Sequence, residues 1–216
     1  MAEVDLPGGD GPGAALGGLS LAERGTPPGR SPLFDARWHY IENPKIAELT
    51  ADERGTLEGQ RAKYYPRRQA DAVLDLLRAT RHDPTFGYRL NSYHHSLQSA
   101  TQVYRAGYPE EDVVVAVLHD IGFHACPERH GAFAAELLGA YISERNYWML
   151  AHHQLVDEPG WKRWQSHPYA GWTETFFEYF DIDAMDPDYD NLPLEFFEPM
   201  VRRTFHWPSR QPNLPA

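Results

Sequence analysis

The 216-residue sequence has very little of several features, and each shortage excludes a class of protein. It has one cysteine, which excludes an internal disulfide and a zinc site built from cysteines. Its longest aliphatic run, residues 113–118, is far too short to span a membrane. Basic residues number 20 against 31 acidic ones, and this net charge of −11 argues against a protein that binds nucleic acid.

The two ends of the chain differ in composition from the rest. Residues 1–32 contain eight Gly, five Pro and almost no large apolar side chains, which predicts a disordered tail. Residues 208–216 predict a short extended tail for the same reason. The segment after Met1 has no basic region followed by an apolar one, so we expect no signal peptide and a cytoplasmic protein. One globular domain is expected over residues 33–207.

Helical spacing dominates the globular part, which predicts an all-α domain of seven or eight helices. Pro66 suits the first turn of a helix whose apolar side chains recur over residues 70–77. Asn91 or Ser92 can cap a second helix that ends at Gly107.

The most apolar helix is expected after Pro109. A proline followed by three carboxylates, residues 110–112, is typical of a helix start. The aliphatic run at residues 113–118 would also fit a buried strand, and the preceding carboxylates favour a helix. Three further helices are predicted from the spacing at residues 134–141, from Ser143 as a cap, and from the phenylalanines at 176–180. A last one is expected over residues 194–205.

Histidine is the residue in excess, with 11 in the chain. Seven of these lie within 60 residues: His94, His95, His119, His124, His130, His152 and His153. Each successive helix places one ionisable group on or near an apolar face, where it is costly unless something satisfies it. The candidates of this kind are His95, His119, Asp120, His130, His153 and Asp181.

A bound metal would satisfy all six groups together. Imidazole and carboxylate without thiolate suit iron, manganese or zinc better than calcium or copper(I). Six donors exceed the four of a structural zinc site and are enough for two metals if one carboxylate bridges. Asp120 is the expected bridge, because it stands between the outer ligands in chain order.

Several choices stay open at this point. His152 competes with His153, and Asp183 with Asp181, as ligands. His94 is expected to point away from His95 on the helix. His124 would support the ligands or line a pocket, and the remaining histidines are expected at the surface: His39, His82, His167 and His206.

The order of these groups resembles the HD-domain superfamily. Asn91-Ser-Tyr-His-His-Ser-Leu-Gln98 is similar to its first motif, and Val117-Leu-His-Asp-Ile-Gly122 contains the His-Asp pair that gives the superfamily its name. The resemblance covers about residues 88–205. It implies a helical bundle with a dinuclear metal site in its core, held by the six candidate ligands given above.

Within this superfamily the chain looks most like the mixed-valent diiron oxygenases, namely myo-inositol oxygenase and the HD-domain enzymes that cleave organophosphonates. Tyr147-Trp-Met-Leu-Ala-His-His153 and Phe180-Asp-Ile-Asp183 resemble their later ligand motifs. The resemblance implies two iron ions in the Fe(II)/Fe(III) state, O2 as co-substrate and a small hydroxylated substrate. Asp120, His124 and Tyr88 are the candidate catalytic residues.

The substrate contacts of those enzymes are not kept. Many HD enzymes have a cation where this chain has Phe123, and myo-inositol oxygenase has a lysine at the position of Met185. The phosphonate enzymes have a glutamate at the position of Tyr88 and a tyrosine at that of Thr85. We therefore expect neither myo-inositol nor an aminophosphonate as substrate. The aromatic residues Tyr88, Phe123 and Trp148 predict a pocket with apolar walls, and residues 156–172 a lid or a long loop.

Two other functions stay open. A metal-dependent phosphohydrolase acting on a phosphate ester or nucleotide would use the same ligands to activate a hydroxide. A metal-binding module without turnover would keep the fold alone. The sequence predicts a small-molecule partner and neither a nucleic acid nor a membrane, and it does not indicate an oligomeric state.

Overall fold

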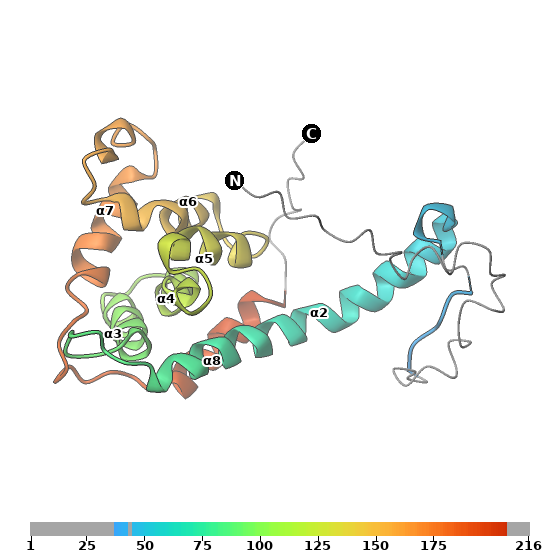
Figure 1. Cartoon of the computed structure of the whole chain (residues 1–216), viewed down its shortest axis with the longest axis horizontal. Coiled ribbons are helices and arrows are strands. Elements are labelled where there is room, and N and C mark those ends of the chain that lie inside the picture. The colour runs from blue at the N-terminus through green and yellow to red at the C-terminus, as the bar shows by residue number, and fades with distance from the viewer. Residues whose placement is uncertain (1–36, 43–44, 207–216) are drawn as a thin grey trace, which may run out of the picture. The chain divides into compact units, whose positions relative to one another are not determined.

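The computed structural model describes residues 37–42 and 45–206. Within these ranges the chain forms seven α-helices, several shorter helices and no strand, which confirms the predicted all-α fold (Figure 1). The α-helices are α2 (Ala51–Ala79), α3 (Ser92–Arg105), α4 (Glu110–Leu118), α5 (His130–Leu138), α6 (Glu144–His152), α7 (Ala170–Phe176) and α8 (Leu194–Thr204). None of the helices in these ranges is long and apolar enough to cross a membrane. The predicted tails, residues 1–32 and 208–216, lie outside the described residues.

The chain divides into two compact units, residues 1–63 and 64–216, and the boundary falls within α2. In the first unit, α2 starts with a capping box. The backbone N–H of Glu53 donates to Thr50 Oγ1 at 3.3 Å, and the backbone N–H of Thr50 donates to Glu53 Oε2 at 2.8 Å. This pattern marks the true beginning of the helix.

The prediction that Pro66 lies in the first turn of a helix is therefore wrong, because Pro66 lies inside α2. A proline leaves the carbonyl four residues earlier without its helical donor. Residue 62 is exposed, so water can satisfy that carbonyl. The apolar face predicted at residues 70–77 is confirmed, since Ala70, Val73, Leu74 and Leu77 are the buried residues of α2.

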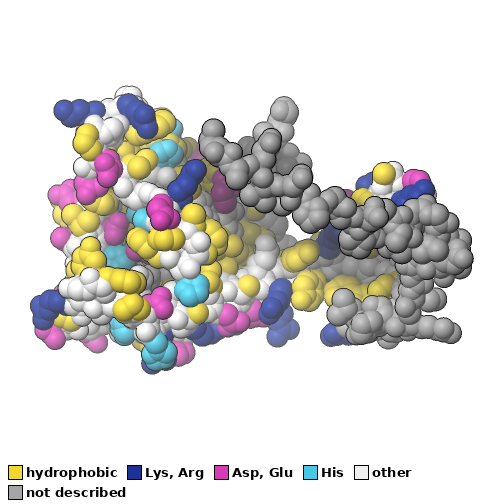
Figure 2. Space-filling model, viewed as in Figure 1, with side chains coloured by type: hydrophobic (Ala, Val, Ile, Leu, Met, Phe, Trp, Pro, Cys, Tyr) yellow, Lys and Arg dark blue, Asp and Glu magenta, His cyan; other side chains and the backbone are white. Residues whose placement is uncertain are grey.

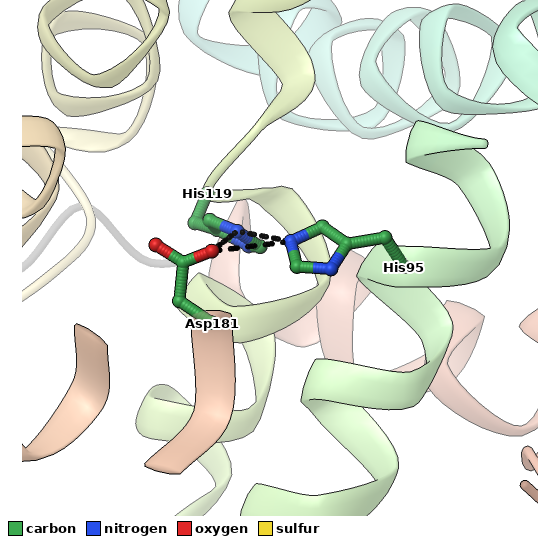
Figure 3. Close-up of side chains that lie close together, drawn as sticks. All are labelled: His95, His119 and Asp181. Carbon is green, nitrogen blue, oxygen red and sulfur yellow. Dashed lines mark hydrogen bonds and ion pairs between the residues drawn. The ribbon is translucent and has the colours of Figure 1, made fainter. Parts of the chain in front are cut away.

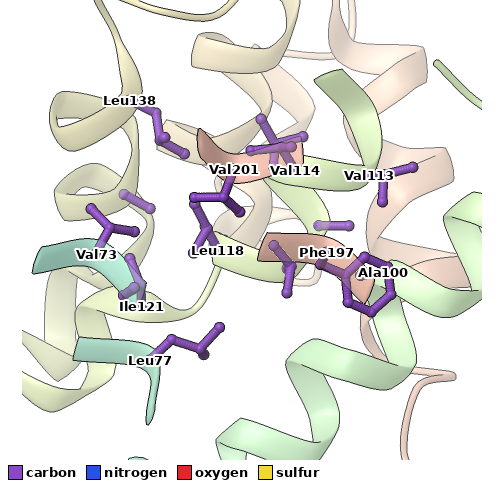
Figure 4. Packing of buried hydrophobic residues seen from close by; sticks show 14 of the residues in the cluster. Val73, Leu77, Ala100, Val113, Val114, Leu118, Ile121, Leu138, Phe197 and Val201 are labelled. Carbon is purple, nitrogen blue, oxygen red and sulfur yellow. The ribbon is translucent and has the colours of Figure 1, made fainter. Parts of the chain in front are cut away.

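The second unit is built around α4. Its residues Val113 to Leu118 are all at most 1% exposed, and the helical alternative for this run is confirmed. α4 packs against α3, α6 and α8. Figure 4 shows side chains of α4 and α8, among them Leu118 and Val201, close together in the core. Burying one such side chain stabilises the fold by about 1.5–3 kcal/mol, so this core fixes where α4 ends.

Surface charges add little to that core. Arg202 Nη1 donates to Asp71 Oδ1 at 2.6 Å, and Arg203 donates two hydrogen bonds to Glu110 at 2.7 and 2.8 Å. Exposed pairs of this kind contribute about 1 kcal/mol or less. Acidic and basic side chains are interspersed on the face shown in Figure 2. The packing of apolar side chains therefore decides the arrangement of the helices.

The helices that carry the candidate ligands begin mostly where the sequence predicts. Asn91 caps α3 by accepting a hydrogen bond from the backbone N–H of His94, and Gly107 follows its end with φ of +80°. Ser143 caps α6 by accepting from the backbone N–H of Asn146. α5 spans His130–Leu138, so it ends three residues before Tyr141, the last residue of the helical spacing at residues 134–141.

The segment of phenylalanines departs from a regular α-helix. α7 ends at Phe176 and continues as one turn of π-helix, Phe177–Asp181. π-helical turns are rare in proteins, but those that occur are often at functional sites. The wider turn changes the direction of the side chains that follow it. Here it ends at Asp181, while Phe176 and Phe180 stay buried.

Candidate metal centre

Six ionisable side chains from five helical segments meet in the core of the second unit. His95 comes from α3, His119 caps the end of α4, and Asp120 follows it. The other three are His130, the first residue of α5, His153, which directly follows α6, and Asp181, which ends the π-helical turn. All six are ligands that the sequence predicts.

Three of these groups form what we call the first half of the centre: His95, His119 and Asp181 (Figure 3). The Nε2 atoms of His95 and His119 lie 3.1 Å apart. Asp181 Oδ1 lies 3.3 Å from His95 Nε2 and 3.7 Å from His119 Nε2. In Figure 3 the three polar tips point toward one another from three different segments.

The second half consists of His130 and His153. Their Nε2 atoms lie 3.2 Å apart. Asp120 Oδ1 lies 3.4 Å from His130 Nε2 and 3.6 Å from His153 Nε2. His153 also joins His119 and Asp120 in a group whose ligand atoms all lie within 4.8 Å of one another, so the two halves are continuous.

Asp120 connects the halves. While its Oδ1 faces the second half, its Oδ2 lies 3.4 Å from His95 Nε2 and 3.5 Å from His119 Nε2. Each carboxylate oxygen thus faces a different pair of imidazoles. This is the arrangement of a carboxylate that bridges two cations.

Backbone carbonyls fix the orientation of all four imidazoles. The Nδ1 atoms of the four rings each lie 2.8–3.1 Å from a carbonyl oxygen, those of Ala184, Ala116, Pro127 and Leu150. A carbonyl only accepts, so Nδ1 carries the proton and donates it. In the neutral ring Nε2 is then left with a lone pair that points into the cluster. Histidines that bind metals are typically held in this way.

The spacing of the Nε2 atoms also fits a shared cation. Two nitrogen ligands about 2.1 Å from one ion, at an angle of about 90–100°, lie roughly 3.0–3.2 Å apart. The two Nε2···Nε2 distances here are 3.1 and 3.2 Å. Two lone pairs facing each other at that distance repel unless a positive charge lies between them.

The two carboxylates attract such positive charge. Burial would raise the pKa of Asp120, but the charge on His119 and the hydrogen bond from His153 outweigh it and hold the pKa at about 2. Burial is outweighed in the same way at Asp181, where His119 and His95 hold the pKa well below its ordinary value. Both carboxylates are therefore ionised at neutral pH, and two negative charges lie in the protein interior.

The histidines respond differently in the two halves. Burial would lower the pKa of His95, but the hydrogen bond with Asp181 and the charge on Asp120 raise it to about 9. The pKa of His119 is also raised, since the charge of Asp120 and the hydrogen bond with Asp181 outweigh burial. Burial lowers the pKa of His130 despite the charge of Asp120. His95 and His119 of the first half therefore hold positive charge more strongly than His130 of the second.

The sequence matches no protein-family model and no curated protein.

The structure decides between the neighbouring candidates. His153 is 1% exposed and joins the cluster, whereas His152 stacks on Trp148 with ring centroids 4.2 Å apart. Asp181 joins the cluster, and Asp183 is exposed. His94 is exposed, as expected, and its Nδ1 lies 2.8 Å from Asn91 Oδ1.

Two candidate catalytic residues lie outside the cluster. Tyr88 is 67% exposed. The side chain of His124 is 46% exposed, and its Nδ1 lies 3.9 Å from Asp83 Oδ2. Neither is brought into contact with the six ligands, so a direct catalytic role in this conformation is not supported for either. Of the three predicted catalytic residues, the structure brings only Asp120 into the cluster.

The expectations for the other histidines and aromatic residues hold in part. His39, His82 and His206 are exposed, as expected. His167 is only partly exposed and stacks on the face of Trp148 with centroids 4.2 Å apart. Trp148 thus lies between two imidazoles that are not among the six candidate ligands. Of the three aromatic residues predicted to line a pocket, Phe123 stacks on a candidate ligand, His130, whereas Tyr88 is largely exposed.

Two glycines that the sequence did not single out allow the ligand segments to approach. A Cβ on Gly131 would lie 2.4 Å from the carbonyl oxygen of Leu150 and 2.9 Å from Cε1 of His153. A Cβ on Gly122 would lie 2.5 Å from Cα of His130. Real Cβ atoms do not come this close, so both glycines are needed for the second half. The only sequence signal is that each lies within two residues of a predicted ligand.

Proposed function

We propose that this protein is an HD-domain diiron oxygenase that uses O2 to oxidise or cleave a small hydroxylated substrate. The observation that carries the proposal is the position of Asp120, whose two carboxylate oxygens face two different histidine pairs. The sequence motifs described above resemble those of such enzymes. The geometry supports a two-cation site, and the resemblance supports iron.

The donor set fits two iron ions. Four imidazole nitrogens and two carboxylates suit iron, manganese or zinc and do not suit a thiolate-seeking metal. The backbone carbonyls already orient each Nε2 inward, so little reorganisation is needed when a metal binds. The first half would offer His95, His119, Asp181 and one oxygen of Asp120. The second would offer His130, His153 and the other oxygen.

The protein side chains give the two halves different tasks. Iron supplies the redox chemistry with O2 and substrate when it is bound. The first half has four protein donors and the second has three, so the second leaves more room for a substrate oxygen. Asp120 holds the halves at a fixed separation. His119 and Phe176 are fully buried beside them and exclude water from the inner side.

The charge around the cluster favours oxidation over phosphate ester hydrolysis. The six ion pairs within the cluster join its own histidines to its own carboxylates, and no Lys or Arg takes part in them. Enzymes that transfer phosphoryl groups commonly use cationic side chains as well as metals to stabilise the charge of the transition state. A neutral hydroxylated substrate needs none.

Metal analysis of the protein as isolated tests the proposal. We expect two irons per chain and, after partial oxidation, a half-integer-spin signal in electron paramagnetic resonance. O2 consumption should then be screened against small hydroxylated compounds. Zinc-, manganese- or magnesium-dependent release of phosphate from nucleotides without O2 would overturn the oxygenase in favour of a hydrolase. Failure to bind any metal would leave a scaffold without this chemistry.

A further inference from the structure

Phe123 is the large aromatic side chain that lies directly on the second half. Its ring stacks on the imidazole of His130, with centroids 4.0 Å apart and an angle of 15° between the planes. Its backbone N–H donates to the carbonyl oxygen of Asp120 at 3.0 Å. The turn that contains the bridging carboxylate therefore also fixes the position of the ring.

The exposure of Phe123 shows that it covers His130 incompletely. Phe123 is 41% exposed, whereas Phe176, on the inner side of the cluster, is fully buried. One face of the Phe123 ring covers His130, and the remaining surface reaches solvent. A molecule that approaches the second half from this side meets an apolar ring before it meets a metal ligand.

The electrostatic surroundings of the second half point to the same class of ligand. The carboxylate of Asp120 lies against His130, with Oδ1 3.4 Å from Nε2. With three protein donors the second half has room for a ligand oxygen, and the polar groups that meet there are the imidazoles of His130 and His153 and the carboxylate of Asp120. A phosphate dianion would therefore face a negative carboxylate and an apolar ring.

We propose that Phe123 is a specificity-determining residue that selects substrates with uncharged hydroxyl groups next to an apolar C–H face and excludes phosphate esters. The hydroxyl oxygen would bind at the second half while the C–H face packs on the exposed part of the Phe123 ring. This proposal rests on the proposed two-metal function, and it adds the class of substrate.

Ligand binding to the Fe(II)-loaded full chain under nitrogen tests the proposal without turnover. Two probes of opposite character are cyclohexane-1,2-diol and inorganic phosphate, each measured by isothermal titration calorimetry. Phe123→Lys should bind phosphate about ten- to hundredfold more tightly than the original protein, because a charge-assisted hydrogen bond replaces an apolar contact. It should bind the diol more weakly.

Tyr104→Lys is the matched control. Tyr104 is 43% exposed, close to the 41% of Phe123, and the substitution changes the net charge equally. It lies near the end of α3, roughly 13 Å along the helix from His95. Phosphate affinity should not change in this variant. An equal gain in both lysine variants, or no gain in Phe123→Lys, would show that Phe123 does not select against phosphate.

The metal content of each protein is measured first and separates the two proposals. If the original chain binds no metal, the proposed function fails and the role of Phe123 fails with it. If only Phe123→Lys loses metal, Phe123→Leu provides the test, since it removes the ring without adding charge. It should weaken diol binding about three- to tenfold and leave phosphate binding unchanged. Unchanged diol affinity would overturn the proposal.

Discussion

The two halves of the cluster use the same types of side chain and differ in almost everything else. The first half joins His95 and Asp181, which lie far apart in the sequence, with His119 between them. The second half joins His130 and His153, which are 23 residues apart on consecutive helices. The first has four protein donors when Asp120 is counted, and the second has three. If the proposed metals bind, the first half should hold its ion more firmly and the second should leave its ion more accessible.

The charges differ in the same sense. The pKa of His95 is raised to about 9 because Asp181 and Asp120 outweigh burial, whereas burial lowers the pKa of His130. His95 in the first half therefore binds a proton at neutral pH more readily than His130 in the second half. Asp181 lies in only one half, so the proposed two-metal site should have one tightly held position and one open position.

Removing the bridge should have the largest effect. Asp120→Ala takes one donor from each half and leaves the facing Nε2 atoms without their nearest shared carboxylate. We expect two-metal binding to be abolished, with a loss of affinity of more than about hundredfold, while the helical content stays the same. Metal analysis and circular dichroism measure the two quantities. Full occupancy in this variant would refute the bridging role.

Removing a ligand from one half should cause the loss of one metal ion per chain. Asp181→Ala should lose the metal of the first half, and His130→Ala that of the second, so each variant retains one ion per chain. His152→Ala is the control, because His152 neighbours a ligand but stacks on Trp148. It should keep both ions. Loss of both ions in either ligand variant would mean that the halves do not bind independently.

Gly131→Ala should displace the candidate ligands of the second half and leave the first half unchanged. The added Cβ would lie 2.4 Å from the carbonyl oxygen of Leu150, so α5 and α6 must separate and His153 must move. We expect one ion to be lost and the free energy of unfolding to fall by roughly 1–3 kcal/mol. In the control Gly171→Ala the Cβ meets nothing within 4 Å, and the helix should be slightly more stable. Equal behaviour of the two variants would contradict the close-approach argument.

The smallest expected difference between the two halves is in the pH dependence of their metal affinity. The raised pKa of His95 means that this ring is protonated at pH 7 without metal, and the metal must displace the proton. Affinity in His130→Ala, which keeps the first half, should fall at least about tenfold for each pH unit below 9, because the pKa of His119 is raised as well. Asp181→Ala keeps the second half, where the lowered pKa of His130 predicts little change between pH 9 and 7. Equal slopes in the two variants would contradict this difference.

The stability of the metal-free protein should also depend on the proton that His95 binds. Because the pKa of His95 is higher in the folded state than the ordinary 6.5, its charge stabilises the fold fully below pH 6.5. That contribution is lost as the pH rises toward 9. The melting temperature of the metal-free protein between pH 6 and 9.5 measures it.

Much of the fold was predictable because local signals state where helices begin and end. Asn91 and Ser143 cap α3 and α6, and the carboxylates after Pro109 start α4. The start of α2 was missed although Thr50 and Glu53 form a capping box, because Pro66 offered a second plausible start. The π-helical turn that ends at Asp181 was not predicted, because helical spacing of the phenylalanines does not distinguish an α-helical from a π-helical turn.

The sequence by itself determined the all-α fold of the described residues and the six candidate ligands. Helical periodicity and capping are local, and a row of ionisable groups on apolar faces is visible without coordinates. Only the tertiary structure decided that His153 and Asp181 join the cluster instead of their neighbours, and that the oxygens of Asp120 face opposite halves. These facts depend on distances between segments far apart in the chain, and long-range packing alone sets those distances.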